Sequence, residues 1–205
     1  MSDSAKELLE YRQRVENAMR GTTPVYFFND NILKAMMIQR AILGGGEVNH
    51  MPGCVRMYCA QGSLFLLSGK VMATNAKIAL DSSGLSDNEV QDWIKWDLWE
   101  ELQEALKEFL SKGKQLELIV ENINLIRQDS KLWQILCENR KNVSVYTLSV
   151  DLGLDHFTAS MESYRIENSD EKKTATCAFH DTENARAFFD SFNVLKRYSQ
   201  PVVIQ

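Results

Sequence analysis

Three residues in the last quarter of the chain have side chains that could do acid–base or phosphate chemistry. They are His156, Arg165 and Glu167, and apolar and polar residues alternate around them from His156 to Ile166, as in a β-strand. Arg165 and Glu167 lie two residues apart, so a strand would place both on one face. There they would pair with each other or with a neighbouring strand, or line a pocket. His156, beside Phe157 at a strand start, is typical of a partly buried ring.

This stretch carries a resemblance to a known family. His156-Phe157 at the head of a strand, then Tyr164-Arg165-x-Glu167, a short apolar strand and a C-terminal amphipathic helix resemble one half of a phospholipase D-like domain. The order of the expected elements from Ala105 to Pro201 is similar to that half as well. The resemblance implies an α/β fold whose family attacks phosphodiesters with a His-x-Lys pair, followed after four intervening residues by an Asp.

The chain departs from that motif at two positions. Thr158 stands where the Lys is expected, and Ser163 stands where the Asp is expected. Without the cation, charge that builds up on a phosphoryl group would lose its main stabiliser. The resemblance therefore implies the scaffold without its usual chemistry, and we expect no catalytic residues. If the chain is an enzyme, the resemblance implies a phosphodiesterase with a non-standard site around His156, Arg165 and Glu167.

No metal or cofactor is expected from the sequence. His50, Cys54 and Cys59 lie close together, but their spacing matches no standard zinc pattern. The run Gly44-Gly45-Gly46 lacks the Lys of a phosphate-binding loop and reads as a loop after a helix.

Hydrophobic periodicity predicts an α/β fold with a mixed β-sheet flanked by helices. We expect an N-terminal helical segment, residues 1–50, packed on a phospholipase D-like α/β domain, residues 51–205. Residues 64–80 are ambiguous, and a helix is favoured there over a hairpin. The predicted helices are 4–20, 29–43, 86–112, one around residue 133 and one from residue 181; the predicted strands are 22–28, 55–60, 116–120, 143–148, 156–166 and 174–179.

The helix that begins at the capping box Ser86-Asp87-Asn88-Glu89 carries surplus tryptophans. Trp96 and Trp99 fall away from the apolar stripe of that helix and toward the side of Leu110. Either the helix is covered on two faces within one domain, or these three residues meet a partner, most simply in a homodimer. Trp96, Trp99 and Leu110 are therefore the residues that we predict to form a partner interface.

Composition limits the classes of partner. The 205 residues carry a net charge of −5 with a pI near 5.3, so a whole-chain attraction to nucleic acid is disfavoured. The N-terminus is polar and acidic, unlike a signal peptide, and no run approaches the roughly 20 apolar residues of a membrane span. We therefore expect no contact with membranes. Four scattered cysteines predict a reducing, cytoplasmic setting.

Three functions follow from these observations. The first is a non-catalytic interaction or regulatory protein on a phospholipase D-like scaffold, homodimeric and with a protein partner. The second is a nucleic-acid-binding accessory factor, and the third is the phosphodiesterase or nuclease around His156.

Overall fold

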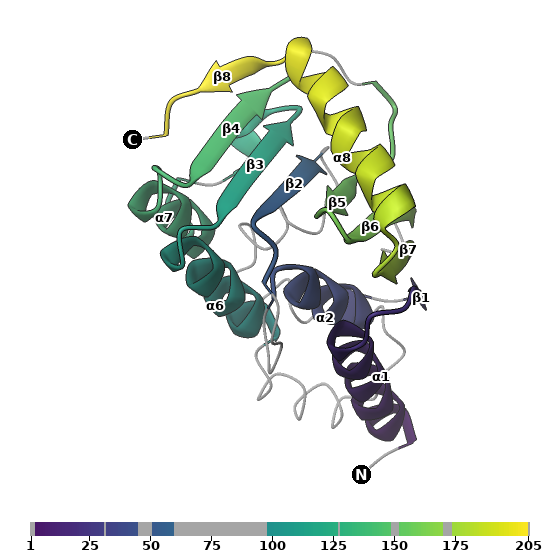
Figure 1. The fold of residues 1–205 in the computed structure, drawn as a ribbon. Helices are drawn as coiled ribbons and strands as arrows, with labels where there is room; N and C mark the ends of the chain where they lie inside the picture. Colours follow the sequence, from purple (N-terminus) through teal and green to yellow (C-terminus); the bar gives the residue numbers. More distant parts are fainter. Residues whose placement is uncertain are drawn as a thin grey trace.

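The computed structural model describes residues 3–30, 32–44, 51–59, 98–126, 128–148, 152–169 and 174–204. Their strands form one mixed sheet in the order β1-β7-β6-β5-β2-β3-β4-β8 (Figure 1). The central strands β2 (Cys54–Cys59), β3 (Gln115–Val120) and β4 (Val143–Thr147) are parallel. The antiparallel strands are β1 (Val25–Asn29), β5 (Phe157–Ala159), β6 (Ser163–Ser169), β7 (Thr174–Phe179) and β8 (Gln200–Val202).

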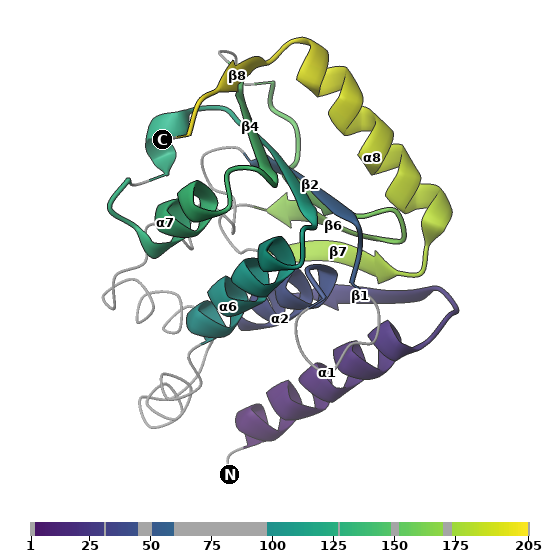
Figure 2. The same ribbon diagram turned by 60° about the vertical axis from the view of Figure 1, so that its left-hand side comes forward.

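Helices cover both faces of the sheet, which confirms the predicted α/β class. The helix α8 (Thr182–Arg197) lies on one face, and Figure 2 shows the remaining helices on the other. Each face has its own core, because successive strand residues point to opposite sides. On β2, Met57 and Cys59 join the larger core, whereas Tyr58 joins the core under α8. The helices on the larger core are α1 (Asp3–Arg20), α2 (Ile32–Ile42), α6 (Leu98–Ser111) and α7 (Lys131–Glu138).

Side-chain caps begin two of the helices that the sequence predicts. The Ser130 hydroxyl accepts a hydrogen bond from the Trp133 amide at 3.1 Å and starts α7. The Asp181 carboxylate accepts from the Asn184 amide at 3.2 Å and starts α8. Gly113 follows α6 with a φ of 72°, a left-handed conformation that glycine adopts without strain.

α2 is the element that closes the larger core. It is apolar nearly all round, as expected of a helix with no solvent face. It contacts α1 and α6 on one side and strands β1, β5, β6 and β7 on the other. Its buried apolar residues are Leu33, Ala35, Met36, Met37, Ile38, Ala41 and Ile42.

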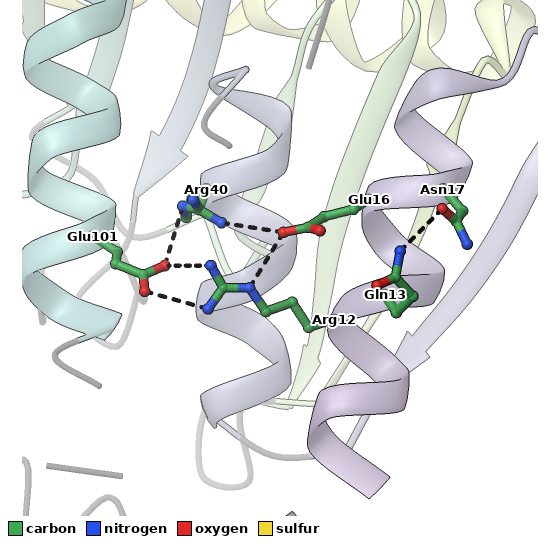
Figure 3. Close-up of polar contacts among 6 residues, drawn as sticks. All are labelled: Arg12, Gln13, Glu16, Asn17, Arg40 and Glu101. Atoms are coloured by element: carbon green, nitrogen blue, oxygen red, sulfur yellow. Dashed lines mark hydrogen bonds and ion pairs between the residues drawn. The ribbon is translucent and has the colours of Figure 1, made fainter. Parts of the chain in front are cut away.

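A cluster of ion pairs joins α1, α2 and α6 at the edge of this core (Figure 3). Arg12 of α1 lies 3.2 Å from Glu101 of α6 and 3.2 Å from Glu16, one turn further along α1. Arg40 of α2 lies 3.3 Å from Glu101 and 3.8 Å from Glu16. The side chains are partly exposed, so each pair contributes about 0–1 kcal/mol, and the cluster mainly fixes how the three helices meet.

The structure refines the predicted organisation. The predicted N-terminal segment contributes β1, which pairs with β7, in addition to the helices α1 and α2. The short edge strand β8 was not predicted. Residues 64–80 and the capping box at Ser86 lie outside the described residues. Among the described residues, no helix is both long and apolar enough to cross a membrane.

Candidate functional site

The register of strands β2, β5 and β6 brings the predicted residues to one face of the sheet. Thr158 on β5 pairs with Met57 on β2 and with Arg165 on β6. His156 continues this ladder, because its carbonyl accepts a hydrogen bond from the Glu167 amide at 2.8 Å. Paired residues in a sheet project to the same side. His156, Thr158, Arg165 and Glu167 therefore share the face that α2 covers.

Arg165 and Glu167 pair with each other, one of the arrangements expected from their spacing, and Arg165 also contacts a further strand. Arg165 Nη1 donates to Glu167 Oε1 at 2.7 Å, and Arg165 Nε donates to Asn29 Oδ1 on β1 at 3.3 Å. Both side chains of the pair are only 2% exposed. Arg165 Nη2 is buried without a hydrogen-bond partner among the described residues. The pair is thus monodentate and closed to solvent.

His156 completes this polar cluster from the neighbouring strand. Its Nδ1 lies 3.6 Å from Glu167 Oε2, and the residue is 4% exposed. The Tyr58 ring lies nearly perpendicular to it, with the ring centroids 6.4 Å apart and an interplanar angle of 71°. An imidazole in this position is buried and faces a carboxylate that Arg165 also holds.

Burial and charge act in opposite directions on Glu167. Burial alone would raise the pKa of its carboxyl group, because the interior disfavours a charge. The contact with His156 Nδ1 at 3.6 Å and the charge and hydrogen bond of Arg165 outweigh burial, and they lower the pKa from 4.5 to about 2. Glu167 is therefore ionised at neutral pH and could not act as a general acid there. Arg165 is held as its counter-ion.

Thr158, at the position where the resemblance places a Lys, is engaged in a different contact. Its hydroxyl donates to Gln39 Oε1 of α2 at 3.0 Å, and Gln39 Nε2 lies 3.8 Å from the Met57 sulfur. Thr158 is 5% exposed and Gln39 is 1% exposed. The space above Thr158 is thus occupied by a side chain from α2.

Two members of the cluster, Asn29 and Gln39, were not singled out from the sequence. Asn29 is fully buried at the end of β1, and Gln39 stands in the otherwise apolar run of α2. A polar residue in a helix that is apolar all round is the signal that could have found Gln39, because such a residue must be buried with a partner.

The predicted partner interface is located only in part. Leu110 is fully buried in the larger core, so it packs within a single chain. Trp99 belongs to α6, but its side chain and Trp96 lie outside the described residues. Among the described residues, no group of three or more His, Cys, Asp and Glu side chains could hold a metal ion.

Comparisons with known proteins identify the fold. The chain matches the structure of TrmBL2, an archaeal chromatin protein that binds DNA, with a TM-score of 0.57 and 11% identity over 97% of this chain. The match spans 62% of the length of TrmBL2. A phospholipase D family member, Nuc from Salmonella typhimurium, matches with a TM-score of 0.51 and 8% identity over 88% of this chain and 99% of Nuc. The chain therefore has a phospholipase D-like fold.

Sequence comparisons give no closer relationship. No protein-family model matches the chain, and no curated protein matches it in sequence. At the identities of the structural matches, the likeness shows the fold alone.

Proposed function

We propose that the chain is a non-catalytic regulatory or interaction domain built on a phospholipase D-like scaffold. The observation that carries this proposal is the contact of Thr158 with Gln39, buried beneath α2. A phosphodiesterase of this fold needs a cation at that position. The chain instead places there a neutral hydroxyl that is already hydrogen-bonded within the protein.

The state of the other candidate residues supports the same proposal. A nucleophilic His must reach the phosphorus atom of a substrate, yet His156 is 4% exposed. Arg165 could stabilise a phosphoryl group, but its charge is compensated by Glu167 at 2.7 Å. Removing either partner would leave a buried charge without compensation, so the pair is better suited to hold three strands together than to open for a ligand.

A phosphodiesterase assay tests the proposal. Wild-type protein and a His156→Ala variant are incubated with bis(p-nitrophenyl) phosphate, and release of p-nitrophenol is followed. We expect both proteins to show the rate of buffer alone. A wild-type rate above buffer that His156→Ala removes, with the variant still folded by circular dichroism, would refute the proposal and favour the enzyme.

Homodimerisation is part of the proposed interaction role. Its basis is the placement of Trp96 and Trp99 off the apolar stripe of their helix. Light scattering of the wild type and of a Trp96→Glu, Trp99→Glu variant tests it. A dimeric wild type and a folded monomeric variant are expected, whereas a monomeric wild type would contradict the dimer.

Nucleic-acid binding is the second candidate function. The observation that favours it is the shared fold with TrmBL2, a protein that binds DNA. The net charge of −5 requires that any such contact be made by a local basic surface. Binding of a duplex whose affinity falls steeply with salt would support this function, and an absence of binding at low salt would exclude it.

A further inference from the structure

Two loops form a basic surface at one end of the sheet. The first, residues 111–115, runs from the last residue of α6 to the first residue of β3, and the second, residues 139–142, connects α7 to β4. Because β3 and β4 are adjacent and parallel, both loops lie at the amino-terminal ends of these strands (Figures 1 and 2). We call the surface made by residues 107–115 and 138–142 the basic end; it comprises the two loops and the ends of the two helices that precede them.

Hydrogen bonds hold the two loops together. The Leu116 amide donates to the Asn142 carbonyl at 2.9 Å. The side-chain amide of Asn142 donates to the Leu110 carbonyl at 3.0 Å, and Gln115 donates to the Asn142 side-chain oxygen at 3.3 Å. These hydrogen bonds therefore fix the cations of the two loops relative to one another.

The charge of the basic end is opposite to that of the whole chain. Lys107, Lys114, Arg140 and Lys141 make no ion pair with any carboxylate that the structure describes, and Lys107, Arg140 and Lys141 are exposed. Lys112 is paired with Glu108. Five cations stand against two carboxylates, Glu108 and Glu138, a net charge of +3 on a chain of −5.

Stabilisation of the helix ends does not fully account for these cations. Lysines and arginines at helix C-termini offset the negative end of the helix dipole, an effect that is confined to the last turn. Neither α6 nor α7 has a basic residue in its last turn. Lys114, Arg140 and Lys141 stand beyond the helices, and Lys107 stands before the last turn of α6.

The residue types of the two loops indicate which kind of polyanion they could bind. Beside its cations, the surface of the loops offers the side-chain amides of Gln115, Asn139 and Asn142. Each donates one N–H within the protein and keeps a second that can donate to a phosphate oxygen. Residues 111–115 and 139–142 include no aromatic side chain on which an unpaired base could stack. They also include no aliphatic side chain that could insert into a lipid layer.

We propose that the basic end binds the phosphate backbone of duplex nucleic acid without reading its sequence. This inference rests on the second function proposed above and assigns it a surface. Contact of the four unpaired cations with four phosphates predicts that log Kd rises with log salt with a slope of about 3.6. Between about 50 and 200 mM salt, this slope corresponds to a loss of affinity of about 10²-fold.

Fluorescence anisotropy with a labelled DNA duplex of about 20 base pairs tests the proposal over that range of salt. The test variant carries Lys107→Gln, Lys114→Gln, Arg140→Gln and Lys141→Gln. The control carries Lys6→Gln, Arg14→Gln, Arg186→Gln and Arg197→Gln, which remove the same charge from exposed positions on α1 and α8. We expect the wild type and the control to bind with the steep slope, and the test variant to lose binding at the lowest salt.

Different failures of this experiment have different meanings. If the wild type does not bind duplex at low salt, both the surface and the nucleic-acid function are wrong. If the test variant binds as the control does, duplex binding stands but the basic end is not its surface. If the wild type binds vesicles of anionic phospholipid more tightly than duplex, the occupant is a membrane surface and the proposal is overturned.

Discussion

Replacing Glu167 by Gln would test whether the buried cluster is a structural unit. The substitution keeps the size and shape of the side chain and removes the charge that faces Arg165 at 2.7 Å. Arg165 would then be a buried cation without a counter-ion. Breaking a buried pair in this way typically costs about 3–5 kcal/mol.

The pKa of Glu167 gives an independent magnitude. The pKa of about 2 in the folded protein lies about 2.5 pH units below its ordinary value of 4.5. At about 1.36 kcal/mol per pH unit, ionised Glu167 contributes about 3 kcal/mol to the free energy of unfolding. Because the folded pKa is the lower one, this contribution is complete above pH 4.5 and is lost as the pH falls toward 2.

Urea unfolding at neutral pH and between about pH 5 and pH 3 measures both effects. We expect Glu167→Gln to lose about 3 kcal/mol at neutral pH, and the wild type to approach the variant as the pH falls. A Glu138→Gln control, at an exposed carboxylate, should stay within about 0.5 kcal/mol of the wild type. A Glu167→Gln loss below about 1 kcal/mol, or parallel pH profiles, would refute the reasoning.

Two further substitutions test the neighbouring contacts. Thr158→Val removes the donor to Gln39 and should lower the free energy of unfolding in urea by about 1–3 kcal/mol. The double variant Thr158→Val, Gln39→Leu should recover much of this loss, because it also removes the oxygen left without a donor. Equal losses in the single and the double variant would contradict the contact. Leu110→Ala should lower the free energy of unfolding by about 2–5 kcal/mol and leave the mass in light scattering unchanged. A change of mass with little loss of stability would indicate that Leu110 lies at an interface between chains.

Local signals in the sequence were sufficient for much of the fold. Ser130 and Asp181 mark the starts of α7 and α8, because a short polar side chain before an apolar period satisfies free helix amides. β8 was missed because it has only three residues and contains Pro201, which is tolerated only at a sheet edge or a strand start.

The candidate site was predictable only where it is local in sequence. The pairing of Arg165 with Glu167 follows from a spacing of two along one strand. Asn29 and Gln39 lie 136 and 119 residues before their partners in the chain. No periodicity links residues over such distances, so only the folded structure reveals that α2 covers the cluster and that β1 supplies Asn29 from the same sheet.

The central claim is that His156 is an interior residue that no phosphodiester can reach. The most direct test is modification of histidine by diethyl pyrocarbonate, with the rate at His156 measured by peptide mass spectrometry in folded and in urea-unfolded protein. We predict that His156 in the folded protein reacts only through transient opening, far more slowly than in the unfolded chain. Reaction of folded His156 at a rate close to that of the unfolded chain would contradict the claim and reopen the catalytic reading.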